Sequence, residues 1–209
     1  MMVAAARAGE WNLVPSAYAE ASRVEQDRLR QIALTQVRET LTKDFLRSDA
    51  VYEAGPAEYL SRAESEQEKV AFVQAWVARA FPPARGKAQL VPDDEQALAI
   101  ATVDGHVQLV ARAGSGKTET VANRAAFLQR HCAVAPAEML LLAFNRDAAH
   151  EMTERVSAKL GKAPLPHIMT FHALAYALVP GAKALLVNSS DGSDQSLNQE
   201  FQAVLLDAM

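Results

Sequence analysis

The sequence has few of the residues from which several kinds of functional site are built. It holds one cysteine, Cys132, so neither an internal disulfide nor a multi-cysteine zinc site is available. We interpret this thiol as a small hydrophobic residue of the core. The five histidines are scattered, and no two lie four residues apart on a helix beside an acid, so a metal site of that kind is not expected.

Long apolar runs and an excess of positive charge are also missing. No stretch reaches the roughly 18 uninterrupted apolar residues of a membrane span, and residues 1–7 lack the apolar core of an export signal. We therefore predict a cytoplasmic protein without a membrane partner. The formal net charge is −4, which argues against binding nucleic acid through bulk positive charge. Weak binding of single-stranded DNA in a local groove is still compatible with this charge.

The first part of the chain is predicted to be helical. Helix-forming residues with apolar positions every three to five residues fill segments 17–46 and 57–80, with a turn at Gly55 and Pro56 between them. The stretch FPPARGKAQL, residues 81–90, has the composition of a linker. We predict a helical N-terminal region over residues 1–87, either as a packing accessory to the second part of the chain or as a docking site for a protein partner.

The pattern then alternates between strands and helices. Apolar runs at 107–111, 139–144 and 167–171 are predicted as buried strands, and helices are predicted at 96–101, after residue 116 to about 130, and at 147–160. Strands alternating with helices favour a parallel sheet of the α/β class. We assign residues 88–187 to this domain, and residues 188–209 to a polar tail or the start of a further element.

The stretch LVARAGSGKTET carries a phosphate-binding loop. Alanine stands at the first position, Ala111, and four residues separate it from Gly116, Lys117 and Thr118. Gly114 and Gly116 let the backbone approach an anion and turn successive N–H groups toward it. The preceding apolar run and the following helix are the surroundings that this motif requires, so the sequence predicts a nucleotide site.

Two side chains of this loop are predicted to carry the chemistry. Lys117 supplies positive charge to the β and γ phosphates, and the hydroxyl of Thr118 is placed to bind Mg²⁺ at the start of a helix. Arg112 stands where a small residue is usual, and either points to solvent or touches the nucleotide. The predicted nucleotide-binding residues of the loop are Ala111, Arg112, Ala113, Gly114, Ser115, Gly116, Lys117 and Thr118.

Four blocks in order extend the motif: DDEQALAI, ARAGSGKT, LLLAFNRDAAHEMTERV and TFHALA, within residues 92–187. They resemble the UvrD/Rep branch of superfamily 1 helicases, and most of all its helicase IV members. The resemblance implies a partial RecA-like P-loop NTPase domain, a short parallel sheet flanked by helices, preceded here by the helical N-terminal region. It implies ATP and Mg²⁺ as cofactors and movement along single-stranded DNA.

The first block resembles the family's Q motif, whose glutamine recognises adenine, and Gln96 is the matching residue. Its amide offers one donor and one acceptor, which suits the edge of adenine. Pro92 stands where the family usually has leucine. The alternative for Gln96 taken alone is an ordinary surface residue at a helix start.

The third block resembles motif Ia, which lines the path of single-stranded DNA. Phe144 matches its aromatic residue, and Asn145 and Arg146 are suited to phosphate or base contacts. Asp147 replaces the usual lysine, which removes a favourable charge from the DNA path. The alternative places Phe144 in the core and makes Asp147 a helix cap.

The fourth block resembles motif Ib. Its residues Thr170, Phe171 and His172 match the family's TFH at a strand end, where the ring and the imidazole can stack on or hydrogen-bond to bases. The alternative for His172 is a structural histidine.

A Walker B acid and a second motor domain cannot be assigned in this sequence. Asp191, Asp194 and Glu200 lie in a polar stretch rather than after an apolar strand. We therefore expect the front portion of an ATP-dependent DNA helicase that binds ATP but is incomplete for catalysis. The alternatives are another P-loop ATPase, or a non-catalytic interaction module with a vestigial nucleotide site.

Overall fold

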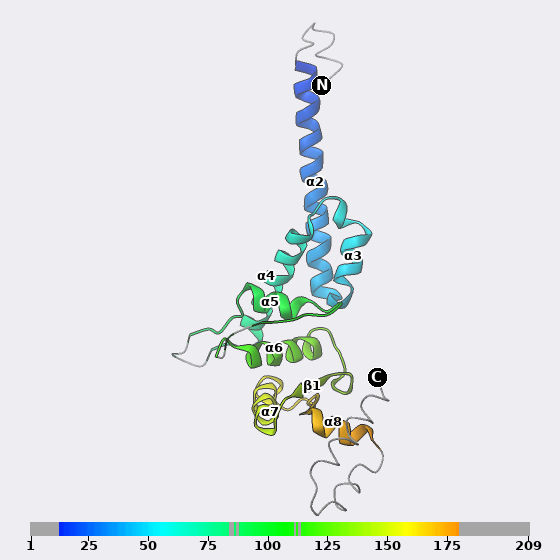
Figure 1. Cartoon of the computed structure of the whole chain (residues 1–209). Helices are drawn as coiled ribbons and strands as arrows, with labels where there is room; N and C mark the ends of the chain where they lie inside the picture. The colour runs from blue at the N-terminus through cyan, green and yellow to red at the C-terminus, as the bar shows by residue number, and fades with distance from the viewer. Residues whose placement is uncertain (1–12, 84–85, 87, 111, 113, 180–209) are drawn as a thin grey trace, which may run out of the picture.

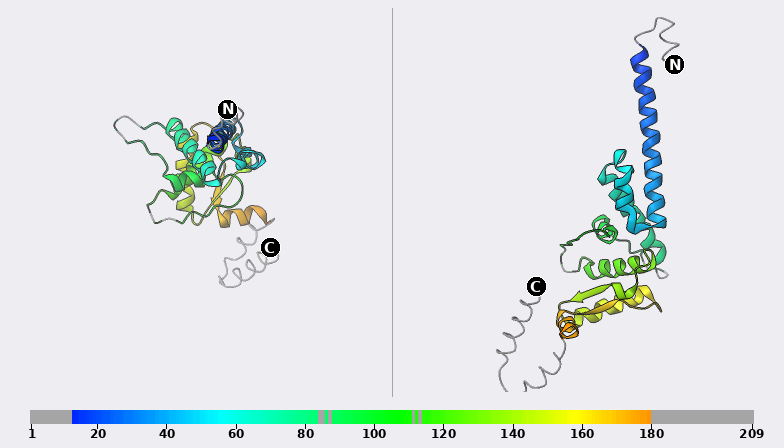
Figure 2. Two further views of the ribbon diagram at one scale, coloured as in Figure 1. Left: turned by 90° about the horizontal axis from the view of Figure 1, so that it is seen from above. Right: turned by 90° about the vertical axis from the view of Figure 1, so that its right-hand side faces the viewer.

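The computed structural model describes residues 13–83, 86, 88–110, 112 and 114–179, with side chains described from residue 20 onward. Figure 1 shows a long helix, α2 (Leu13–Lys43), that projects from one end of the molecule. Shorter helices pack around its base, and a small sheet with its helices lies at the other end. The two views of Figure 2 show the same elongated arrangement.

The N-terminal region is helical, as the sequence predicts. The base of α2 is followed by η1 (Phe45–Arg47), α3 (Ser48–Ala54), η2 (Pro56–Glu58) and α4 (Arg62–Ala80). The second long helix begins five residues later than predicted because Ser61 caps it. The Ser61 hydroxyl accepts from the Glu64 backbone N–H at 3.3 Å, and a Glu64 carboxylate oxygen accepts from the Ser61 N–H at 2.8 Å, which completes a capping box.

Ion pairs hold the helices of this region to one another. Arg38 of α2 makes two hydrogen bonds, of 2.6 and 2.7 Å, to the Glu68 carboxylate of α4, and Arg30 pairs with Glu64. Between α3 and α4 the buried ammonium of Lys69 lies 2.6 Å from the carboxylate of Asp49. A buried ammonium without such a partner would be costly, so this pair fixes how α3 sits on α4.

The second part alternates helices and strands. It contains α5 (Asp94–Ala101), α6 (Lys117–Arg130), η3 (Pro136–Glu138), β1 (Leu140–Ala143), α7 (Arg146–Leu160), β2 (His167–Thr170) and α8 (Phe171–Leu178). Strands β1 and β2 pair in parallel, with Leu140 opposite His167 and Ala143 opposite Thr170. The predicted α/β class and the two strands after residue 138 are confirmed.

The strand predicted at residues 107–111 is wrong for the residues that the structure describes there. Residues 107–110 form no strand, and Val107 and Val110 are 44% and 85% exposed. Apolar residues specify a strand only where a neighbouring strand pairs with the backbone. Within the described residues the sheet contains only β1 and β2, so this run has no strand partner.

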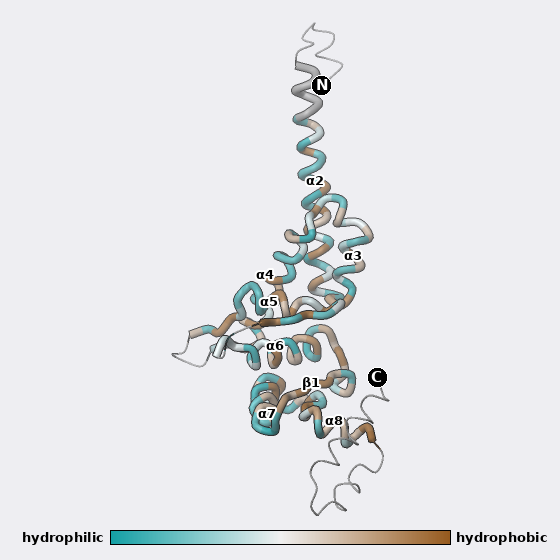
Figure 3. The backbone as a smooth tube through the Cα atoms, in the orientation of Figure 1, coloured by the Kyte–Doolittle hydropathy of each residue, from teal (hydrophilic) through white to brown (hydrophobic). Residues whose placement is uncertain are grey.

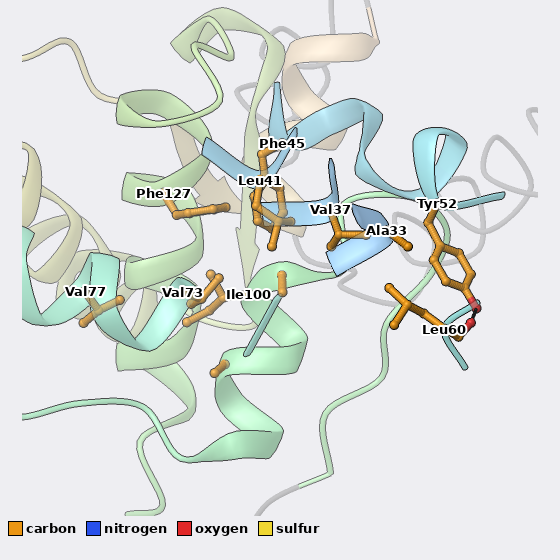
Figure 4. Close-up of a cluster of buried hydrophobic side chains, with 12 residues drawn as sticks. Ala33, Val37, Leu41, Phe45, Tyr52, Leu60, Val73, Val77, Ile100 and Phe127 are labelled. Carbon is orange, nitrogen blue, oxygen red and sulfur yellow. Dashed lines mark hydrogen bonds between the residues drawn. The ribbon is translucent and has the colours of Figure 1, made fainter. Parts of the chain in front are cut away.

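The main hydrophobic core crosses from the helical N-terminal region into the second part. Figure 4 shows its side chains converging from α2, η1, α4, α5 and α6. Phe127 of α6 is fully buried and meets the rings of Phe45 and Trp76 edge to face, with centroids 4.8 and 5.0 Å apart. Residues on both sides of the 81–90 segment therefore share one core.

A second, smaller core lies on the opposite side of α6. Ala122, Ala125 and Ala126 of α6 pack against Val156 and Leu160 of α7. Small side chains let the two helices approach closely. Helix α6 therefore lies between the helical region on one side and α7 with the sheet on the other, as Figure 1 shows.

The projecting part of α2 is mainly hydrophilic, as the tube in Figure 3 shows. None of the helices in the described part of the chain combines the length and the apolar content needed to cross a membrane. The polar tail predicted at 188–209 lies outside the described residues.

The shared core predicts the effect of truncating Phe127. Phe127→Ala should lower the free energy of unfolding by about 3–5 kcal/mol, because it leaves a cavity between both parts of the chain. Urea denaturation followed by circular dichroism measures this. The matched control on α6 is Val121→Ala, at a 37% exposed position, which should change that free energy by less than about 1 kcal/mol. Two separate unfolding transitions in the parent protein would contradict a common core.

The capping box predicts a dependence of stability on pH. The Ser61 backbone N–H, followed by Arg30 and the Ser61 hydroxyl, lowers the pKa of Glu64 from 4.5 to about 2. A lowered folded-state pKa stabilises the fold above pH 4.5, and the contribution is lost as the pH falls toward 2. Glu64→Gln keeps an acceptor for the Ser61 N–H but removes the titrating group, so its stability should fall less over this range. A midpoint near 4.5 for Glu64 in an NMR titration would contradict the assignment.

Candidate nucleotide and nucleic-acid sites

The glycines of the predicted phosphate loop adopt the backbone that the motif requires. Gly114 has φ of 79° and Gly116 has φ of 86°, in the left-handed region where a side chain costs roughly 1 kcal/mol or more. Gly116 is the N-cap of α6, so the loop leads directly into the helix N-terminus. Ala111 and Ala113 of the predicted loop lie outside the described residues.

Three hydrogen bonds within the loop share one acceptor, the carbonyl oxygen of Arg112. The Arg112 carbonyl oxygen accepts from the Lys117 ammonium at 2.6 Å, from the Ser115 hydroxyl at 2.8 Å and from the Ser115 N–H at 3.3 Å. The Lys117 side chain therefore reaches from the first turn of α6 back across the loop to Arg112. A phosphate at this place would take over the hydrogen bond that the ammonium now gives to a backbone oxygen.

The second residue of α6 is Thr118, half-buried beside Lys117. The next residue, Glu119, turns toward α7, where its carboxylate lies 2.6 Å from the Lys159 ammonium and 3.4 Å from the Arg155 guanidinium. This carboxylate is therefore neutralised by α7. The hydroxyl of Thr120, in the same turn, donates to the Gly116 carbonyl oxygen at 3.1 Å, and Thr118 stays the residue predicted to bind Mg²⁺.

The structure brings Gln96 to the loop, although the two are 19 residues apart in sequence. Asp93 caps α5 by accepting from the Gln96 backbone N–H at 2.8 Å. The Gln96 side chain then donates from Nε2 to the Ser115 carbonyl at 3.0 Å. Gln96 and the phosphate loop thus form one cluster.

Two exposed aromatic rings mark the other predicted site. Phe144 follows β1 and is 86% exposed, and Phe171 follows β2 and is 58% exposed. Because Ala143 lies opposite Thr170 in the parallel register, both phenylalanines follow the carboxyl ends of adjacent strands. The alternative that places Phe144 in the core is excluded.

The polar residues beside these rings divide into caps and exposed groups. Asn145 caps α7 by accepting from the Ala148 N–H at 2.8 Å, and Thr170 caps α8 by accepting from the Ala173 N–H at 3.2 Å. Arg146 and His172 are exposed. The helix cap that the alternative gives to Asp147 is therefore made by Asn145, and Asp147 lies in the first turn of α7.

Comparison with known proteins gives a family for this arrangement. The model of the UvrD/REP helicase N-terminal domain matches residues 92–207, more than half of the chain. The chain belongs to the UvrD/REP helicase family. The resemblance predicted from the four sequence blocks is confirmed.

Curated relatives in the UvrD/REP family match a limited part of their own length. DNA helicase IV of Escherichia coli (strain K12) is 36% identical over 107 residues, which are 51% of this chain and 16% of that protein. The ATP-dependent DNA helicase PcrA of Bacillus subtilis (strain 168) is 42% identical over 82 residues, 39% of this chain and 11% of PcrA. PcrA of Leuconostoc citreum is 38% identical over 89 residues, 42% of this chain and 12% of that protein.

Several residues near the phosphate loop could not be predicted from the sequence, because they act through tertiary contacts. Arg124 of α6 donates to the carbonyl oxygens of Ala99 and Ile100 at the end of α5, and burial lowers its pKa. Glu119 and Gln74 likewise bind partners on other helices. Their spacing in the sequence carries no sign of these contacts.

The single cysteine lies at the far end of the P-loop helix and is not part of either site. Cys132 is partly buried against the main core, so its interpretation as a core hydrophobe is confirmed. Burial, partly offset by Arg124, raises the pKa of Cys132 to about 12. The thiol therefore stays protonated near neutral pH and is a poor nucleophile.

Proposed function

We propose that this chain is the ATP-binding front portion of a UvrD/REP-type DNA helicase or translocase that acts on single-stranded DNA. The observation that carries the proposal is the contact between Gln96 and the glycine-rich loop in front of α6. It joins an amide suited to adenine with a loop and helix N-terminus suited to phosphates. Residues 88–187 are the proposed ATP-binding domain.

Each residue of the cluster has a proposed task. Gln96 binds the base, the N–H groups around Gly114 to Gly116 bind phosphate oxygens, and Lys117 neutralises the β and γ phosphates. Thr118 contributes a hydroxyl ligand to the Mg²⁺ that accompanies ATP. Arg112 is exposed beside the loop, where its charge favours an anionic ligand.

The exposed rings suit a strand of unpaired bases. Aromatic faces stack on bases of any sequence, and Arg146 and His172 add polar contacts from the same edge. The net charge of −4 and Asp147 beside Arg146 favour weak binding. Phe144 and Phe171 are therefore proposed as the main DNA contacts, with Asn145 and Thr170 shaping the turns that present them.

Hydrolysis is not part of this proposal for the chain alone. A Walker B acid follows a buried strand, whereas in the described residues β1 leads to Phe144 and Asn145, and β2 leads to Phe171. ATP binding without turnover is therefore the proposed activity. A cytoplasmic location remains a prediction from the sequence, and so does a protein partner for the N-terminal helices.

Titration with a fluorescent ATP analogue and Mg²⁺ tests the nucleotide site. Lys117→Ala should weaken binding by about tenfold to a hundredfold, because a charge-assisted hydrogen bond is lost. Gln96→Ala should weaken it by about fivefold and leave tripolyphosphate binding unchanged. Lys162→Ala and Gln67→Ala, both at exposed positions, are the matched controls.

Phosphate release, followed with and without single-stranded DNA, completes that experiment. Turnover by the chain alone would show that a catalytic acid is present and would contradict the binding-only role. Biological function retained in Lys117→Ala would instead favour an interaction module with a vestigial nucleotide site.

Fluorescence anisotropy with a labelled thymidine oligonucleotide at low salt tests the DNA site. Phe144→Ala and Phe171→Ala should each cost about 1–3 kcal/mol of binding free energy, the usual value of a base stacked on an aromatic ring. Phe144→Tyr keeps the ring and should bind like the parent. Ile32→Ala, at an exposed apolar position on α2, is the control, and an equal loss there would refute a specific aromatic site.

A further inference from the structure

A glutamine of the N-terminal region forms hydrogen bonds to the start of α5, the helix that carries Gln96. Gln74 lies on α4, and its Nε2 donates to the Asp94 carboxylate at 2.9 Å and to the Pro92 carbonyl oxygen at 3.2 Å. Pro92 is buried, and Asp94 is the first residue of α5. One side-chain amide therefore fixes both the approach to α5 and its first turn.

The same turn holds the proposed base-recognising residue. Asp93, between the two acceptors of Gln74, caps α5 through the Gln96 backbone N–H. The Gln96 side chain reaches the Ser115 carbonyl at 3.0 Å. An uninterrupted series of contacts therefore leads from α4 through the start of α5 to the phosphate loop.

Helix α5 depends on such external contacts. It has only eight residues, and an isolated helix of that length is not stable in water. Its buried residues Ala97, Ile100 and Ala101 anchor the inner face in the main core, but they leave the exposed first turn to polar contacts. A second glutamine, Gln89, ties the preceding segment to α4 through the carbonyl oxygens of Ala78 and Phe81 at 3.2 and 3.3 Å.

We propose that Gln74 is a positioning residue for base recognition, acting through the first turn of α5 on Gln96. The inference rests on the proposed ATP site and gives the N-terminal helices a role in it. Without the Gln74 contacts the Gln96 side chain would have to be ordered during binding, and that entropy cost reduces affinity. This cost lowers the affinity only for ligands that carry a base. The affinity for a phosphate chain alone does not change, because the loop and Lys117 bind it.

Calorimetric titration of the full chain with ATP and, separately, with tripolyphosphate, both with Mg²⁺, tests this role. Gln74→Ala is expected to weaken ATP about twofold to fivefold and to leave tripolyphosphate unchanged. Gln67→Ala is the matched control, because Gln67 lies on the same helix and lines the same groove beside α5. Combining Gln74→Ala with Gln96→Ala should add little to the loss from Gln96→Ala alone.

The possible outcomes separate this inference from the proposed function. If the parent protein binds ATP and Gln96→Ala weakens it, but Gln74→Ala binds like the parent, the positioning role is wrong and the ATP site stands. Equal losses of ATP and tripolyphosphate in Gln74→Ala would show general destabilisation and would also overturn the role. A parent protein that binds neither ligand would overturn the proposed function and this inference with it.

Discussion

The packing of α6 between two cores is the constraint on which the rest of the structure depends. One face of the helix buries Phe127 among rings of the N-terminal region, and the other packs Ala122 and Ala126 against α7. The helix begins at the phosphate loop, so the position of Lys117 follows from both contacts. At its other end, His131 lies 2.8 Å from the Leu41 carbonyl oxygen and stacks on Phe127, which ties the helix to the base of α2.

Polar contacts also hold α6 in place between its neighbours. Arg124 fixes α6 to the last carbonyl groups of α5, while the Glu119 pair with Lys159 fixes the first turn of α6 to α7. The two contacts leave the helix little freedom to slide between its neighbours. The Lys159 ammonium also offsets a carboxylate that would otherwise stand close to the proposed phosphate site and oppose an anion there.

Local signals explain how much of this was predictable from the sequence. The glycine-rich turn that ends at Gly116 and the apolar runs that became β1 and β2 each depend on neighbours in the chain, and the structure contains the turn and both strands. The strand predicted at 107–111 is absent from the described residues 107–110, because strand pairing is set by distant residues and apolar composition alone does not specify it. The start of α4 was misplaced because the capping pair Ser61 and Glu64, rather than helix-forming composition, sets it. The roles of Gln74 and Glu119 depend on tertiary contacts and had no local signal.

The small sheet also depends on α6. A two-stranded sheet has little stability of its own in water, so β1 and β2 rely on the helices that cover them. Leu141 of β1 and Ile168 of β2 make this contact, because their side chains pack against the smaller core of α6 and α7. Phe144 and Phe171 directly follow these strands, so the spacing of their backbones is set by the pairing of β1 with β2. Helix α7 connects α6 to the sheet, because it binds the first turn of α6 through the Lys159–Glu119 pair and contacts both strands.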